Sequence, residues 1–174
     1  MEKIVKCPLP PYKKTLTVFK REEGENPIIE VPHINTPVEN GYDLEKILYE
    51  KSLKLPNLVH SLRENDIKKY FSDNSLNGID HWIQIDNKHF FIQDKWKESL
   101  NQQEVSQFLN CVTRIQLRLQ QPNSVNLLWI SKRSPTPNCL KMLQERKVHI
   151  VINDESLDSL AKNTIVKIFE LVSF

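Results

Sequence analysis

The sequence is poor in glycine, with only Gly24, Gly41 and Gly78 among its 174 residues. Phosphate-binding loops and the nucleophile turn of α/β-hydrolases need glycines at fixed spacing, and no P-loop, GxGxxG or GxSxG pattern is present. Nucleotide-driven motors and Rossmann dehydrogenases are therefore poorly supported.

Cysteine and long apolar runs are also scarce. The three cysteines, Cys7, Cys111 and Cys139, are odd in number and widely spaced, which indicates free buried thiols rather than a disulfide framework or a CxxC zinc site. No apolar run approaches the length of a membrane span, and the N-terminal MEKIVKCPLPPYKK lacks the apolar core of a secretory signal. We therefore expect an intracellular protein without a membrane partner, in the cytoplasm, or in the nucleus if its source is eukaryotic or viral.

Neither sign of charge dominates the composition. Lysine and arginine total 24, aspartate and glutamate total 22, and the formal net charge is +2. Such a small excess does not indicate a nucleic-acid partner by itself, so any such partner has to be argued from local groups. The hydrophobic share of 39% and the charged share of 26% are those of an ordinary folded domain.

The first forty residues differ from the rest because prolines interrupt every periodic run, at Pro8, Pro10, Pro11, Pro27, Pro32 and Pro37. We predict a proline-rich N-terminal arm over residues 1–40, with short strands at TLTVF and PIIEV. Residues 41–174 are predicted to form one domain.

This domain alternates between helical and strand patterns. Helices are predicted over residues 40–55, 102–119, 137–146 and 156–172, with one or two further helical turns over residues 64–71. Strands are predicted over residues 58–62, 79–85, 89–96, 125–131 and 147–153. The order α-β-β-β-α-β-α-β-α predicts an α/β fold with a mixed central sheet that helices flank on both faces.

The predicted hairpin carries an unusual polar group at one end. Because side chains alternate across a strand, Gln93 and Lys95 share a face of the second strand, and Asp80 lies on the matching face of the first. A two-residue connection at residues 87–88 would set Asp80 opposite Lys95, and a connection at residues 86–87 would set it opposite Gln93. A three-residue connection would separate the groups.

These polar groups suit a hard divalent cation. The carboxylate of Asp80, the amide oxygen of Gln93 and the backbone carbonyl of Asp94 are oxygen ligands of the kind that Mg²⁺ takes. The ammonium group of Lys95 can orient a water molecule or offset charge on a phosphate. The alternative is a cross-strand ion pair between Asp80 and Lys95 with Gln93 exposed, and the hairpin alone does not decide between the two.

Several short motifs, taken in order, resemble the Mrr-like branch of the PD-(D/E)XK nuclease superfamily, which has the restriction endonuclease fold. GYDLE at residues 41–45 looks like the opening of its first helix, GID at residues 78–80 like its Gly-[Ile/Val]-Asp element, and QDK at residues 93–95 like its Gln-x-Lys strand. EVSQF, LLWISKRSP and VHIVIND then follow in the order that such domains have. The resemblance covers residues 41–171.

The resemblance implies a DNA endonuclease that hydrolyses phosphodiester bonds with Mg²⁺ (or Mn²⁺). Asp80 would be the main metal ligand and Lys95 the catalytic lysine. Gln93 would replace the usual acidic ligand, and Glu45 would complete the metal shell directly or through water. Because Gln93 is neutral, the cation should bind more weakly than it would to two carboxylates, with a DNA phosphate supplying the missing charge.

Candidate DNA contacts follow the two strands that lead to this site, namely Trp96, Lys97, Ser131, Lys132 and Arg133. The alternatives are a solvated turn for the basic residues and core packing for Trp96. Two other functions stay open beside the endonuclease: a nuclease-fold module without turnover that binds nucleic acid or a protein partner, and a structure-selective repair nuclease or junction resolvase. A homodimer would suit the cutting of two strands.

Overall fold

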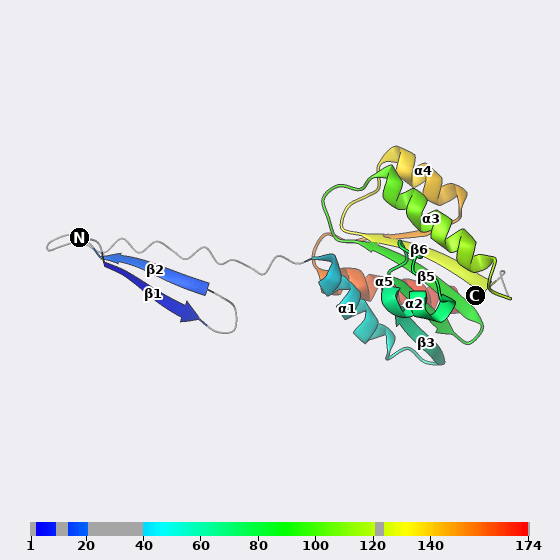
Figure 1. Cartoon of the computed structure of the whole chain (residues 1–174), viewed down its shortest axis with the longest axis horizontal. Helices are drawn as coiled ribbons and strands as arrows, with labels where there is room; N and C mark the ends of the chain where they lie inside the picture. The colour runs from blue at the N-terminus through cyan, green and yellow to red at the C-terminus, as the bar shows by residue number, and fades with distance from the viewer. Residues whose placement is uncertain (1–2, 10–13, 21–39, 121–123, 174) are drawn as a thin grey trace. The chain divides into compact units, whose positions relative to one another are not determined.

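The computed structural model describes residues 3–9, 14–20, 40–120 and 124–173, and the chain divides into two compact units, residues 1–38 and 39–174. In the first unit, strands β1 (Lys3–Leu9) and β2 (Lys14–Lys20) pair antiparallel (Figure 1). β2 confirms the predicted strand at TLTVF, whereas β1 was not predicted. β1 runs through Pro8, which a two-stranded sheet tolerates because both of its strands are edges. The predicted strand at PIIEV lies outside the described residues.

The second unit holds the remaining elements, in the order α1 (Gly41–Ser52), β3 (Leu58–Arg63), α2 (Glu64–Phe71), β4 (His81–Ile85), β5 (Lys88–Lys95), α3 (Gln102–Gln116), β6 (Val125–Ser131), α4 (Pro137–Glu145), β7 (His149–Ile152) and α5 (Leu157–Val172). The sheet order is β3-β4-β5-β6-β7, antiparallel from β3 to β5 and parallel from β5 to β7. The predicted mixed α/β fold is therefore confirmed, and it is consistent with a restriction endonuclease-like architecture. The predicted helix over residues 102–119 ends at Gln116, three residues early.

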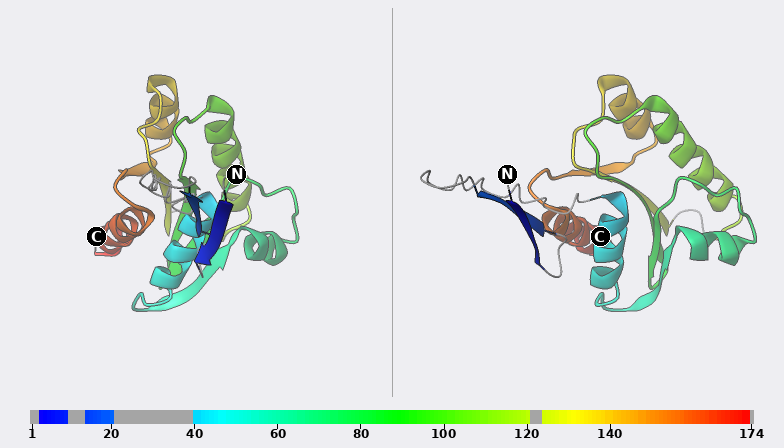
Figure 2. Two further views of the ribbon diagram at one scale, coloured as in Figure 1. Left: turned by 90° about the vertical axis from the view of Figure 1, so that its left-hand side faces the viewer. Right: turned by 60° about the vertical axis from the view of Figure 1, so that its left-hand side comes forward.

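Helices cover both faces of this sheet (Figures 1 and 2). α1 and α5 pack on the face to which Ile83, Phe90 and Ile92 point, while α2, α3 and α4 pack on the face of Trp82 and Phe91. Trp82 and Trp129 are almost fully buried in the core on the second of these faces. In the described part of the chain, no helix is long and apolar enough to cross a membrane.

The β4–β5 turn decides the register of the hairpin. Ile85 pairs with Lys88, so Asp86 and Asn87 form the connection, and Asp86 takes a positive φ of 50° that aspartate tolerates well. The N–H of Asp80 donates to the carbonyl of Ile92, one residue before Gln93. The register that sets Asp80 opposite Gln93 is therefore correct, and the one that sets it opposite Lys95 is wrong.

The segment that leads into Asp80 is held against α3. Gly78 has a φ of 116°, and a Cβ atom there would lie 3.2 Å from the backbone nitrogen of Phe108. The Cys111 thiol also donates to the carbonyl of Asn77, at 2.7 Å. Only glycine allows this close approach with this backbone conformation, so Gly78 fixes the direction in which the chain enters β4.

Candidate active site at the end of β4 and β5

Asp80, just before β4, and Gln93, near the C-terminal end of β5, meet at one end of the hairpin. The amide nitrogen of Gln93 donates to Oδ2 of Asp80 and, at 3.2 Å, to the backbone carbonyl of Asp94. The backbone N–H of Asp94 donates to the same Asp80 oxygen, at 2.8 Å. Gln93 is only 1% exposed, and Asp80 makes no ion pair with Lys95 in the described part of the chain. The alternative of a surface ion pair with an exposed Gln93 is therefore wrong.

An open pocket of about 240 Å³ lies in front of these groups, lined by Gly41, Tyr42, Glu45, Asp80, Asp94, Lys95, Trp96, Lys97 and Glu104. The lining comes from the start of α1, the residue before β4, the end of β5 with the two residues after it, and the start of α3. Both helices open with a capping box, Asn40 with Asp43 in α1 and Asn101 with Glu104 in α3. Six of the ten residues predicted for the site thus line one pocket, and Gln93 joins it through its bond to Asp80.

The electrostatics of the pocket centre on Asp80. Burial, followed by the neighbouring carboxyl group of Asp94, raises the pKa of Asp80 to about 8, against the opposing effect of the positive charge of Lys95. A carboxyl group in this state holds its proton at neutral pH until a cation approaches. Lys95 lines the same pocket as Asp80 and Asp94.

Asp94 forms a buried pair with His81 on the other face of the sheet. His81 Nε2 and Asp94 Oδ2 share a hydrogen bond of 2.9 Å, and both side chains are almost fully buried. Burial raises the pKa of Asp94 well above its ordinary value, as does Glu45, and burial lowers the pKa of His81 to about 4, so both groups favour their neutral forms. His81 therefore faces away from Asp80, its neighbour in the chain.

Sequence reasoning missed the carboxyl group of Asp94, because it considered only the backbone carbonyl as a ligand. The signal was present: Asp94 continues the face of Phe90 and Ile92, where a polar residue is out of place. A Cβ atom on Gly41 would lie 3.9 Å from Asp94 Oδ1, so the first turn of α1 closes over this carboxyl group.

Glu45 reaches the pocket but carries a partner of its own. The guanidinium group of Arg63 lies 3.1 Å from Glu45 Oε2 and 5.1 Å from the ring centroid of Tyr42. Glu45 acts on the pKa of Asp94 and His81, whereas it is not among the groups that act on Asp80. Arg63, which the sequence did not single out, thus partly neutralises the acidic residue from α1.

The predicted DNA contacts are engaged in surface pairs. Lys97 lies 2.6 Å from Glu104, another residue that the sequence did not single out. Lys132 and Arg133 both pair with Glu98, and Arg133 also lies 3.2 Å from Asp154.

Trp96 and Ser131, also predicted to contact DNA, are more buried than the sequence indicated. Trp96 is partly buried against the α1–α5 core, with Lys132 Nζ 5.4 Å from its ring centroid. Ser131 is fully buried, and its hydroxyl donates to the carbonyl of Arg133 at 2.7 Å. A DNA contact through the Ser131 hydroxyl therefore has no support in the structure.

The site offers oxygen donors rather than a preformed metal cluster. In the described residues, no group of three or more His, Cys, Asp or Glu side chains is placed to hold a metal ion. Gln93 Oε1 is buried and has no hydrogen-bond partner, while the amide nitrogen faces Asp80 Oδ2 and the Asp94 carbonyl. Rotation of the amide group would exchange its nitrogen and oxygen and direct three oxygen atoms toward one point, a donor set that fits a hard cation.

Comparison with known proteins adds little to this geometry. No family model matches the chain, and no curated protein matches it. Among solved structures, protein VC1899 from Vibrio cholerae is similar with 12% sequence identity and a TM-score of 0.45, over 74% of this chain and 32% of that one. The chain thus spans about a third of the length of that protein, and a likeness this weak carries no argument about function.

Proposed function

We propose that the protein is a metal-dependent DNA endonuclease that hydrolyses phosphodiester bonds with Mg²⁺ (or Mn²⁺) in an intracellular compartment. The observation that carries the proposal is the meeting of Asp80 and Gln93, hydrogen-bonded to each other, with Lys95 on the same strand end and in the same pocket as Asp80. An acidic group, a second oxygen donor and a lysine around one open pocket form a constellation suited to phosphodiester hydrolysis.

The oxygen atoms around Gln93 support a cation at this point. Asp80 Oδ2 and the Asp94 carbonyl both accept from the same amide nitrogen, so these two expected ligands already converge. Asp80, Gln93 and the Asp94 carbonyl would hold the ion, with Glu45 reaching it directly or through water. A bound Mg²⁺ would supply Lewis-acid polarisation of the phosphodiester.

The remaining groups have separate roles. Lys95 would neutralise charge on the phosphate and orient the attacking water. Asp80 would release its proton when the cation binds, because a divalent ion favours the carboxylate form. The buried bond between His81 and Asp94 would hold the end of β5, so that the Asp94 N–H keeps its bond to Asp80.

DNA would reach the site over a surface whose basic side chains form ion pairs that DNA phosphates could replace. Lys97, Lys132 and Arg133 are paired with Glu104 or Glu98 at the surface, and such exposed ion pairs contribute little free energy. DNA phosphates could therefore replace these carboxylates, and Trp96 lies beside them. A homodimer would place two such sites on one duplex.

One observation favours a second candidate, a nuclease-fold module that binds nucleic acid or a protein without turnover. The site has one carboxylate fewer than a conventional pair, and Glu45 is partly neutralised by Arg63. Both features weaken the electrostatic attraction of the site for a divalent cation. A structure-selective repair nuclease or junction resolvase would share the chemistry and differ in its substrate.

Incubation of the protein with supercoiled plasmid and Mg²⁺ or Mn²⁺ tests the proposal. We expect nicking by the wild type, a loss of about 100-fold or more for Asp80→Ala and Lys95→Ala, and full activity for Lys141→Ala, which changes an exposed lysine on α4. A wild type that never nicks DNA, or site variants that cut as well as the wild type, would refute the enzyme. Retention of DNA without cutting would support the binding module, and preferential cutting of branched DNA would support the resolvase.

A further inference from the structure

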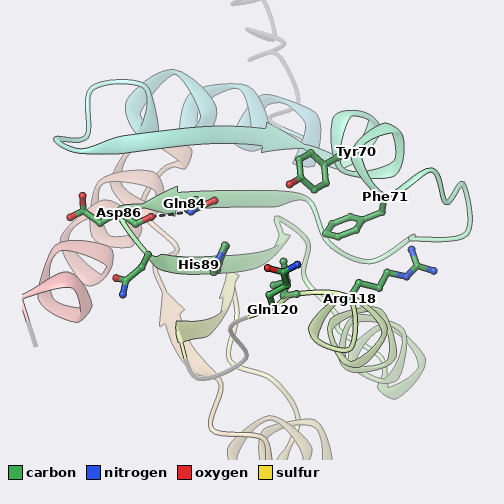
Figure 3. A pocket seen from close by; sticks show the side chains of 9 residues that line it. Tyr70, Phe71, Gln84, Asp86, His89, Arg118 and Gln120 are labelled. Carbon is green, nitrogen blue, oxygen red and sulfur yellow. Dashed lines mark hydrogen bonds between the residues drawn. The ribbon is translucent and has the colours of Figure 1, made fainter.

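A second cavity lies at the opposite end of β4 and β5. Its volume is about 550 Å³, and α2, the β4–β5 turn and the chain that follows α3 supply its lining. Figure 3 shows the rings of Tyr70 and Phe71 on one side, Gln120 and Arg118 on the other, and Gln84 and His89 from the strands between them. None of the residues proposed for the nuclease site takes part.

One wall of the cavity is aromatic and firmly supported. Tyr70 is 62% exposed, yet its ring meets the buried ring of Trp82 edge-on, with 4.8 Å between centroids. Phe71 stacks on the same indole at 5.2 Å and an interplanar angle of 21°. A large exposed aromatic ring that a buried aromatic cluster holds in place offers a flat surface on which a planar ring can stack.

The side chains across the cavity from this wall are neutral, and each has a hydrogen-bond donor or acceptor that is still available. Nδ1 of His89 accepts from Trp82 Nε1 at 3.1 Å, and burial lowers the pKa of His89, so the imidazole is neutral and carries its proton on Nε2. The Gln84 amide nitrogen donates to the carbonyl of Asp86 at 2.9 Å, which leaves the Gln84 oxygen as an acceptor. The Gln120 amide has no partner among the described residues.

The charges around the cavity do not favour a phosphate. Arg118 is part of the lining, but its guanidinium group is held by Asp73 at 2.8 Å. Among the described lining residues, Asp86 alone carries a carboxylate, which adds negative charge. A neutral ring with donors and acceptors on its edge therefore suits this cavity better than an anion.

We propose that this cavity binds a nucleobase, which stacks on Tyr70 and forms hydrogen bonds with Gln84 and His89. The base could belong to a free nucleoside or to an unpaired position in a single-stranded nucleic acid. Bases inside a duplex are stacked on both sides and cannot enter. This inference goes beyond the proposed endonuclease, because binding of a base uses neither Asp80, Gln93 nor a metal ion.

Titration of the full chain in EDTA tests the proposal, with binding followed by calorimetry and by the fluorescence of the tryptophan residues. The probes are the four deoxynucleosides, a single-stranded oligonucleotide of mixed sequence and the matching duplex. We expect saturable binding of at least one nucleoside or of the single strand that depends on Tyr70, whereas duplex binding at the surface near the nuclease site should not depend on Tyr70. Tighter binding of the single strand than of any nucleoside would identify a nucleic acid as the source of the base, and the reverse order would identify a free nucleoside.

Variants separate this site from the nuclease site and from non-specific stacking. Tyr70→Ala should weaken binding about tenfold or more, and Gln84→Leu should weaken it to a smaller extent. Phe169→Ala, which removes an exposed ring on α5, and Asp80→Ala should leave binding unchanged. The proposal is overturned if no nucleoside or single strand binds, or if Tyr70→Ala and Gln84→Leu bind the nucleoside and the single strand like the wild type.

Discussion

The two ends of the β4–β5 hairpin belong to the same pair of strands but have opposite character. At one end, Asp80, Gln93 and Asp94 are almost fully buried, and burial raises the pKa of both aspartates. At the other end, His89 is also buried, but Gln84 is only partly buried and Asp86 is exposed, and all three line an open cavity. Because burying ionisable groups costs free energy, the two buried aspartates at one end are the reason that we propose the active site there.

The largest effect is expected from Asp80→Asn, which removes the buried ionisable group and keeps its shape. Folded Asp80 holds its proton up to about pH 8, whereas the unfolded residue releases it near pH 3.8. The folded state therefore binds more protons between these values, and the free energy of unfolding falls as pH rises through this window. Denaturant unfolding at pH 5 and pH 9 should show this loss in the wild type and a loss smaller by more than about 1.4 kcal/mol in the variant.

Asp66→Asn, which changes an exposed aspartate on α2, is the control for this experiment, and its unfolding should depend on pH like that of the wild type. A wild type and an Asp80→Asn variant with the same pH dependence would contradict the assignment of buried charge to this end of the hairpin.

A smaller loss of folding stability is expected when a substitution displaces the chain before Asp80. Gly78→Ala adds a Cβ atom 3.2 Å from the backbone of α3 at a φ of 116°, so we expect destabilisation of about 1–3 kcal/mol. Gly41→Ala is the matched control, because its Cβ would meet only Asp94 Oδ1 at an ordinary 3.9 Å. Thermal unfolding measures both, and equal effects of the two variants would show that Gly78 does not fix the entry into β4.

The substitution Gln93→Glu tests whether only one end of the hairpin binds a metal ion. A second carboxylate beside Asp80 should raise the affinity for Mg²⁺ or Mn²⁺ about tenfold, since it restores a negative charge to the oxygen donors. Gln84→Glu adds the same charge at the other end of the hairpin and should leave the affinity unchanged. Calorimetric titration with Mn²⁺ would measure both, and an unchanged affinity in Gln93→Glu would speak against a cation at Asp80.

The smallest effect on stability is expected from Lys132→Ala, because its partner Glu98 is 63% exposed and surface ion pairs contribute less than about 1 kcal/mol. If Lys132 contacts DNA, the same change should reduce the slope of log binding constant against log salt concentration by about one phosphate contact. Binding to a short duplex in Ca²⁺ at several salt concentrations measures this slope, and an unchanged slope would remove Lys132 from the proposed DNA surface.

Local pattern was sufficient to predict most of the fold. The apolar spacing of residues 102–119 predicted α3 within three residues of its end, and the alternation of side chains in the hairpin predicted that Asp80 and Gln93 share a face, where they are hydrogen-bonded. The approach of Gly41 to Asp94, and of Arg63 to Glu45, could not be predicted in this way. These contacts join elements distant in the chain, and no local periodicity encodes the angle at which they pack.

The sequence by itself determined that the chain forms a mixed α/β sheet and that Asp80, Gln93 and Lys95 share one face of a hairpin, because period and polarity are local properties. Only the tertiary structure decided that the connection is Asp86-Asn87, that the Gln93 side chain is buried against Asp80, and that α1 closes over Asp94. Burial and the pKa values that follow from it depend on which distant elements exclude water, and that is a property of the packed molecule.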